Sequence, residues 1–118
     1  MSQPAVSIHP YFKVHPGKLE AARALLPKFV EKTTSEPGCV FYEFTINGDV
    51  VFCREAYTNA EGALAHLQNV GDILAEMLKL SDLIRLELHG PEQELEKLQG
   101  PLADLKPEWF VYETGLRK

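Results

Sequence analysis

The stretch that decides the fold is residues 39–57, which read CVFYEFTINGDVVFCREAY. It contains two runs rich in β-branched and aromatic residues, separated by Asn47-Gly48. Asn-Gly is a strong signal for a two-residue turn, because both residues tolerate positive φ angles. The stretch therefore predicts a β-hairpin with strands over 39–46 and 50–57.

The register of this hairpin follows if the Asn-Gly pair is the whole loop. Tyr42 then faces Cys53. Because side chains alternate along a strand, Tyr42, Glu55 and Tyr57 share one face of the sheet. Cys39 lies on the other face from Cys53, so a disulfide between them is not expected.

Both faces of the hairpin are apolar. One face carries Val40, Tyr42 and Phe44, and the other carries Phe41 and Phe52. An antiparallel sheet with one solvated face should alternate more cleanly between apolar and polar residues. Helices can cover one face, and a second subunit in a two-fold dimer is an economical cover for the other.

The chain before the hairpin predicts a strand and a helix. Residues 6–14 have strand composition, and Pro10 inside them predicts an edge position or a bulge because proline lacks the N–H of a ladder. Residues 18–35 have apolar side chains at helical spacing. Pro27 is expected to kink or split that helix.

The chain after the hairpin predicts two helices and a strand. Asn59 is placed to cap a helix over 60–70, and Asp72 to cap the next one. The following strand, 82–89, puts three apolar residues on one face: Ile84, Leu86 and Leu88.

The last segment, 91–118, extends this arrangement. Pro91 opens a helix, Gly100-Pro101 interrupts it, and 109–114 predict a final strand. The order βαββαβ predicts a ferredoxin-like α+β fold with an antiparallel sheet. We expect one domain over residues 1–118, with a core at about 6–90 and residues 91–118 as a C-terminal extension.

Composition excludes several classes of protein. The 118 residues carry a formal net charge of −5 with no basic block, so nucleic acid is not an expected partner. The apolar runs are too short to span a membrane, and no secretory signal is visible, so we expect a cytoplasmic protein. Two cysteines and four widely spaced histidines predict no metal site. No nucleotide or serine-hydrolase motif occurs.

Several local patterns together carry a family resemblance. Glu36-Pro37-Gly38-Cys39 leads into Tyr42-Glu43, and His66 follows on a helix. Over about residues 6–90 the chain resembles the antibiotic biosynthesis monooxygenase (ABM) family of the dimeric α+β barrel superfamily. The resemblance implies a homodimer whose sheets pack face to face, with a pocket between sheet and helices in each subunit. It also implies oxygenation of hydroxylated aromatics or quinols without metal or flavin, or degradation of haem.

The haem-degrading branch of the family is matched poorly. That branch has an Asn on the first strand, a Trp on the second helix and a His about ten residues later. An ungapped comparison places His9 or Tyr11, His66 and Glu76 at these positions. None of the three residue types is matched, so haem degradation is ranked behind the alternatives.

His66 is the candidate catalytic residue. It lies at the edge of the apolar stripe of its helix and is expected to reach the lip of a pocket. Neutral imidazole can take a proton from a phenol or quinol hydroxyl, which primes such a substrate for reaction with oxygen. The alternative is a boundary histidine bonded to a carbonyl or to water.

The candidate substrate-binding residues are aromatic or acidic. Tyr42 and Tyr57 can contact an aromatic ligand, although tyrosines with this spacing are often core residues. Glu55 is either a pocket acid or half of an ion pair. His9 and Tyr11 share one face of the first strand and are expected to line the same pocket, with a solvated edge as the alternative.

Two further interpretations complete the prediction. Trp109, Phe110 and Tyr112 are expected to dock on this sheet or on a partner's, and a dimer contact is favoured over closure of the pocket. The first functional hypothesis is a homodimeric, cofactor-independent monooxygenase that acts on a quinol or hydroxylated aromatic. The alternative is a non-catalytic dimer that binds a small ligand or serves as a structural unit.

Overall fold

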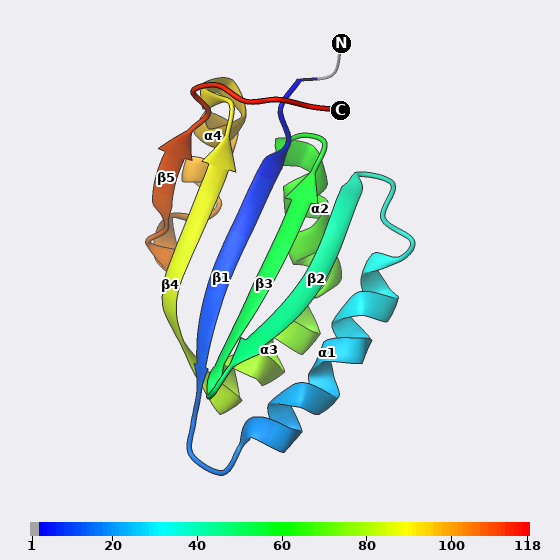
Figure 1. Ribbon diagram of the computed structural model, residues 1–118, viewed down its shortest axis with the longest axis vertical. Coiled ribbons are helices and arrows are strands. Elements are labelled where there is room, and N and C mark those ends of the chain that lie inside the picture. Colours follow the sequence, from blue (N-terminus) through cyan, green and yellow to red (C-terminus); the bar gives the residue numbers. More distant parts are fainter. Residues whose placement is uncertain (1–2) are drawn as a thin grey trace.

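The computed structural model describes residues 3–118 and shows the predicted α+β arrangement (Figure 1). Five strands form one sheet in the order β2-β3-β1-β4-β5. The first four pair antiparallel, and β5 adds to β4 in parallel. The elements are β1 (Val6–Val14), α1 (Leu19–Thr33), β2 (Cys39–Asn47), β3 (Val50–Tyr57), α2 (Ala60–Asn69), α3 (Gly71–Leu80), β4 (Ser81–Gly90), α4 (Glu92–Gln99), the 3-10 turn η1 (Ala103–Leu105) and β5 (Glu108–Val111).

The hairpin forms, but its turn lies one residue later than predicted. Asn47 pairs with Val50, so the loop is Gly48-Asp49, and Tyr42 faces Glu55 instead of Cys53. Gly48 has φ +60°, which fits a turn with glycine at its first central position. Each residue of β2 therefore faces a residue of β3 that lies two positions later than predicted. Because side chains alternate with period two, the predicted faces of Tyr42 and Glu55 are unchanged.

The prediction for Cys39 was wrong because the start of β2 is irregular. The register shifts between Cys39 and Phe41, and Cys39 pairs with Tyr57 on the face that also carries Cys53. Both thiols are nevertheless free. Cys53 and Tyr57 are four residues apart along β3, roughly 13 Å at 3.3 Å per residue, which is far beyond disulfide reach.

Of the two alternatives predicted for Pro10, the structure has an irregular register and not an edge position, and Pro27 does not split its helix. Pro10 lies in β1, the middle strand of the sheet, so the edge position is excluded. The register of β1 against β4 shifts next to it, between Tyr11 and Phe12. Pro27 lies inside α1, which continues as one helix from Leu19 to Thr33.

That register shift also corrects the face predicted for β4. Phe12 pairs with Leu83, whereas Tyr11 pairs with Arg85, so Ile84 is left out of the pairing. Ile84 is 55% exposed, and Leu83 packs against the core in its place. At the helices, Asn59 caps α2 as predicted, but Val70 and not Asp72 holds the N-cap position of α3.

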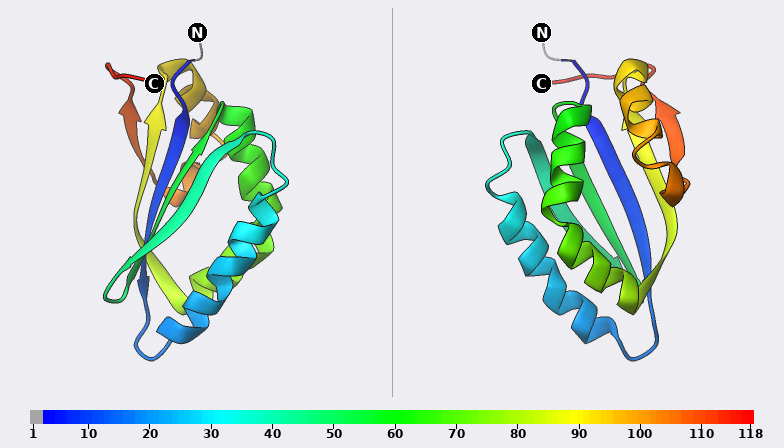
Figure 2. Two further views of the ribbon diagram at one scale, coloured as in Figure 1. Left: turned by 45° about the vertical axis from the view of Figure 1, so that its right-hand side comes forward. Right: turned by 180° about the vertical axis from the view of Figure 1, so that it is seen from behind.

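All the helices cover one face of the sheet (Figure 2). The core lies between these two layers, with Tyr57 and Leu88 among its fully buried side chains. The other face carries half-buried residues, including His9, Tyr11 and Phe52, and no helix within residues 3–118 covers it. The partner subunit expected there stays a prediction. Within the same residues, no helix is long and apolar enough to cross a membrane.

Candidate functional site

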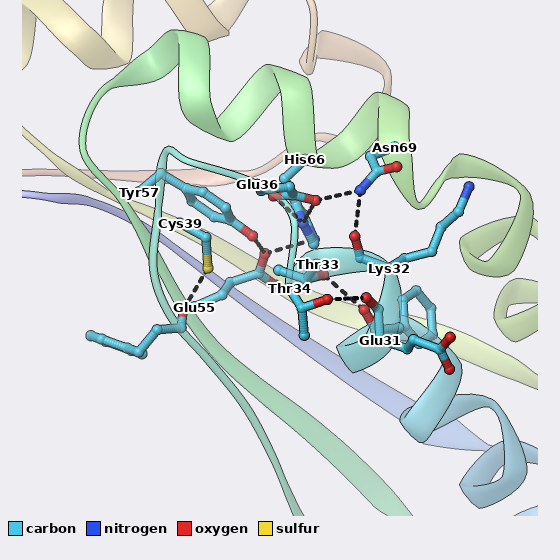
Figure 3. Close-up of polar contacts among 12 residues, drawn as sticks. Glu31, Lys32, Thr33, Thr34, Glu36, Cys39, Glu55, Tyr57, His66 and Asn69 are labelled. Atoms are coloured by element: carbon cyan, nitrogen blue, oxygen red, sulfur yellow. Dashed lines mark hydrogen bonds and ion pairs between the residues drawn. The ribbon is translucent and has the colours of Figure 1, made fainter.

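His66 occupies the centre of a buried polar cluster between α2 and the sheet (Figure 3). The helix that carries it is fixed at its start, where the Asn59 side chain accepts a hydrogen bond from Gly62 N–H at 2.9 Å. The imidazole lies between two tyrosine rings, at centroid distances of 4.8 Å from Tyr42 and 5.1 Å from Tyr57. It is 1% exposed, so it is a buried residue and not one at the lip of a pocket.

Glu36 binds one edge of the His66 ring. Its two carboxylate oxygens lie 3.0 and 3.1 Å from Nδ1 of His66. The Asn69 amide bridges Glu36 to α1, because it donates to Glu36 Oε2 at 2.8 Å and to the Lys32 carbonyl at 2.9 Å. A carboxylate only accepts hydrogen bonds, so neutral His66 carries its proton on Nδ1 and has its lone pair on Nε2.

Glu55 lies at the other edge of the ring. Its Oε1 is 3.4 Å from His66 Nε2 and accepts a hydrogen bond from the Tyr57 hydroxyl at 2.6 Å. Glu55 is 4% exposed, and burial raises the pKa of its carboxyl to about 7 although the Tyr57 hydrogen bond acts in the opposite direction. This carboxyl therefore titrates near neutral pH.

The pKa of His66 moves in the opposite direction. Burial lowers it below its ordinary value, and the nearby Glu36 carboxylate opposes that shift. A protonated Glu55 beside a neutral His66 is consequently the favoured state at slightly acid pH. In this state the Glu55 carboxyl is positioned to donate toward Nε2. The two groups form an acid–base pair whose charged forms are both disfavoured by burial.

Two further groups of the cluster stay protonated. Burial raises the pKa of the Tyr42 hydroxyl and of the Cys53 thiol well above their ordinary values, and the neighbouring Glu55 carboxylate adds to both shifts. Neither group therefore supplies an anionic nucleophile at neutral pH. They act instead as hydrogen-bond donors, of which the thiol is the weaker, and they line the space around Glu55.

A narrow cavity of about 50 Å³ opens at this cluster. Its polar end is lined by Tyr42, Cys53, Glu55 and His66, and its other lining residues are all apolar. The volume is enough for a few water molecules and smaller than the roughly 150 Å³ at which an apolar cavity accepts benzene. The arrangement can accept or donate a proton at one end of an otherwise apolar space.

The structure separates His9 and Tyr11 from this site. Residues of β1 alternate between the faces, and the cavity contacts the strand through Ile8, Pro10 and Phe12. His9 contacts Ser7 on the open face of the sheet, with Nε2 to Oγ at 2.8 Å. The prediction that His9 and Tyr11 line the pocket of His66 was therefore wrong, because it did not fix which face of β1 meets the helices.

Two members of the cluster were not among the predicted site residues. In the sequence analysis Glu36 is named only as part of the Glu-Pro-Gly-Cys motif, and Asn69 is not named. A helical spacing of three residues places Asn69 on the same side of α2 as His66, which is the signal that could have indicated it. Within residues 3–118, no group of three or more His, Cys, Asp or Glu side chains is arranged so that it could hold a metal ion.

The comparison with family models identifies the family of this chain. Residues 5–71 match the model of the antibiotic biosynthesis monooxygenase (ABM) family. The chain belongs to this family. The matched part contains every polar residue of the site, from Glu36 to Asn69, whereas the C-terminal extension lies outside it. The resemblance inferred from the sequence motifs is thereby confirmed.

Solved structures of other proteins share this fold. MupZ from Pseudomonas fluorescens is 41% identical, with a TM-score of 0.94, and the alignment covers all of this chain and 92% of MupZ. Rv0793 from Mycobacterium tuberculosis shares the fold at 23% identity and a TM-score of 0.66, over 75% of this chain and 95% of Rv0793. SO0527 from Shewanella oneidensis also shares the fold, at 22% identity and a TM-score of 0.66, over 74% of this chain and 90% of SO0527. A comparison with curated proteins found no match.

Proposed function

We propose that the chain is a cofactor-independent monooxygenase that acts on a quinol or a hydroxylated aromatic. The observation that carries this proposal is the Glu55–His66 pair at the polar end of the apolar cavity. Membership of a monooxygenase family supplies the reaction class, and the pair supplies the proton acceptor that such a reaction needs.

The proposed reaction begins with loss of the substrate's hydroxyl proton. Glu55 is the catalytic base, in the state where it is ionised and His66 is neutral. Because the pKa of Glu55 is about 7, this state becomes populated as the pH rises through neutrality. His66 is its immediate partner through Nε2, and Glu36 stabilises any positive charge that develops on the ring.

The electron-rich phenolate then reacts with molecular oxygen. A phenol oxidised to a quinone loses four electrons, and the same four electrons reduce O₂. The O–O bond breaks, and one oxygen atom becomes the new carbonyl at a ring carbon that loses its hydrogen. The other oxygen atom leaves as water, with that ring proton and the hydroxyl proton returned by Glu55. The substrate supplies all the electrons in this scheme, so no further reductant is required.

Binding of a ring requires the cavity to widen. The space of about 50 Å³ is smaller than an aromatic ring needs, so the helices and the sheet must separate when the substrate enters. Aromatic side chains at Phe12, Phe29, Tyr42 and Phe44 line the cavity and can pack against the ring. The apolar lining also lowers the local dielectric constant, so the interaction between Glu55 and His66 is stronger than it would be in water.

Oxygen uptake with labelled oxygen tests the proposal. Wild type is mixed with a panel of quinols and hydroxylated polycyclic aromatics under ¹⁸O₂, and uptake above the autoxidation blank with one label in the product is expected. Glu55→Gln and His66→Gln should abolish it, whereas the exposed control variants Glu43→Gln and His15→Gln should retain it. Uptake that survives both site variants would remove the pair from the mechanism.

A non-catalytic, ligand-binding protein is the second candidate function. One observation favours it: among residues 3–118, every buried side-chain nitrogen or oxygen already has a hydrogen-bond partner. The polar cluster is thus satisfied without any ligand. Saturable binding of a hydroxylated aromatic without oxygen uptake would select this function. A Soret shift on adding haem would instead support the haem-binding alternative.

We further propose that the protein is a homodimer through the open face of the sheet. Tyr11 and Phe52 lie there with ring centroids 4.7 Å apart, and neither is fully exposed nor fully buried. A contiguous set of such side chains is typical of a protein interface. Light scattering behind a sizing column measures the mass directly, and a mass of about one chain would contradict the dimer.

A further inference from the structure

We propose that the C-terminal extension forms the far wall of the cavity, and that Leu102 and Leu105 in it set the length of the apolar body that the site accepts. The proposal rests on the proposed function only for the location of the site at Glu55 and His66. It assigns the extension, which lies outside the family match, as the segment that determines specificity.

The cavity runs across the sheet, from one strand to the next. Its polar end lies at β2 and β3, and its walls continue through β1 to Leu83 and Leu86 on β4. Leu102 and Leu105 come next, beyond β4. Two strand spacings separate β3 from β4, which is about 10 Å. The extension therefore lies at the end of the cavity opposite the acid–base pair.

The extension is fixed on the α2 side of this wall. The buried Glu94 of α4 accepts a hydrogen bond from the backbone N–H of Ala60 at 2.8 Å, at the first residue of the helix that carries His66. This hydrogen bond lowers the pKa of Glu94, so the contact is made by a carboxylate. Lys97 pairs with the same Glu94 at 3.2 Å.

The extension is also fixed on the sheet side, where β5 pairs with β4 and Trp109 lies opposite Leu88. The two leucines lie on the short connection between these attachments, which begins after Gly100-Pro101. It ends at Lys106, whose φ of +51° terminates η1. The wall is therefore a single turn held at both ends.

The two leucines have different positions in this wall. Leu102 is 5% exposed and belongs to the buried core cluster that also contains residues of α2 and α4. Leu105 is 39% exposed although it also lines the cavity, so one side of it meets solvent. The thinnest part of the wall is therefore at Leu105, and this side chain can be changed with little loss of core packing.

The lining also defines the chemistry of the ligand. Hydrogen-bonding side chains occur only at the Glu55 end, and every lining residue from β1 to the extension is apolar. A ligand that fits has one protic group at Glu55 and an apolar body that extends toward Leu105. A charged group on that apolar body would be buried without a partner, which is strongly disfavoured.

Straight-chain primary alcohols test this wall as probes. Binding of each member from 1-butanol to 1-decanol to the full chain is followed by ¹H–¹⁵N chemical-shift titration. In wild type the affinity should rise about fourfold per methylene until the chain meets the wall, and then fall. Leu105→Ala should move this optimum to chains one to three carbons longer, and Leu105→Trp to shorter ones.

Leu78→Ala is the matched control. Leu78 is 38% exposed, close to the value for Leu105, but does not line the cavity. The proposal is overturned if the optimum stays in place in both Leu105 variants, if Leu78→Ala moves it equally, or if no alcohol binds to any variant. If the preferred alcohol length moves in the Leu105 variants but no substrate supports oxygen uptake, the wall proposal stands and only the oxygenase function is rejected.

Discussion

The replacement Glu55→Gln gives the sharpest test of the electrostatics of the site. Gln keeps the shape of the side chain but has no acidic proton. Burial raises the pKa of Glu55 from its ordinary 4.5 to about 7 in the folded protein. The native state therefore binds this proton more tightly than the unfolded chain does, and Glu55 stabilises the fold least at alkaline pH.

The magnitude follows from the pKa values of Glu55 in the folded and unfolded chain. Between pH 4.5 and pH 8 the wild type should lose about 3 kcal/mol of stability through Glu55, because a difference of one between the two pKa values corresponds to roughly 1.4 kcal/mol. The loss sets in above pH 4.5 and is complete once the pH has passed 7. Glu55→Gln has no such loss, so its stability relative to wild type should increase by about 3 kcal/mol over this range.

Urea unfolding at pH 4.5, 6, 7 and 8 measures this difference. The single tryptophan, Trp109 on β5, reports the transition by fluorescence, and far-UV circular dichroism gives an independent signal. Glu43→Gln is the control, because Glu43 is exposed on β2 and its pairing with Arg54 is a surface contact. A difference between Glu55→Gln and wild type that stays constant with pH would refute the raised pKa.

Three other predictions concern the cap of α2, the contact between Glu36 and His66, and the open face of the sheet. Asn59→Ala removes the cap of α2 and should lower the free energy of unfolding by about 1 kcal/mol, with Asn59→Ser restoring most of it; no loss would mean that the cap is dispensable. Glu36→Gln should lower the pKa of His66 further in an NMR titration, because the Glu36 carboxylate opposes the lowering by burial; an increase would contradict the pairing. Phe52→Asp places a charge on the open face and should convert a dimer to monomers in light scattering; a dimer that persists would place the interface elsewhere.

Much of the fold could be predicted from local patterns. The β-branched and aromatic runs of β2 and β3, the cap at Asn59 and the breaks at Pro91 and Gly100 each specify structure within a few residues. The predicted register of the hairpin differs from the observed one because Asn47-Gly48 and Gly48-Asp49 are adjacent candidates for the turn. Only the φ of Gly48 and the pairing of Asn47 with Val50 distinguish them.

The site was predicted less completely, because it depends on long-range packing. Helical periodicity placed His66 at the edge of a stripe, but its burial results from Tyr42 and Tyr57 of the sheet packing on both sides. Glu36 comes from the loop after α1, thirty residues away in sequence, and no local pattern predicts that it reaches Nδ1. His9 was wrongly placed in the site, because alternation along a strand defines two faces but does not say which of them the helices cover.

The protonation state of the His66 ring tests the acid–base pair most directly. Long-range ¹H–¹⁵N spectra of the full-length protein at pH 7 distinguish the two neutral tautomers from the imidazolium ion. The arrangement of Glu36 and Glu55 predicts a neutral ring with its proton on Nδ1 and a hydrogen-bond-accepting Nε2. A ring protonated on Nε2, or an imidazolium ion at pH 7, would contradict the account.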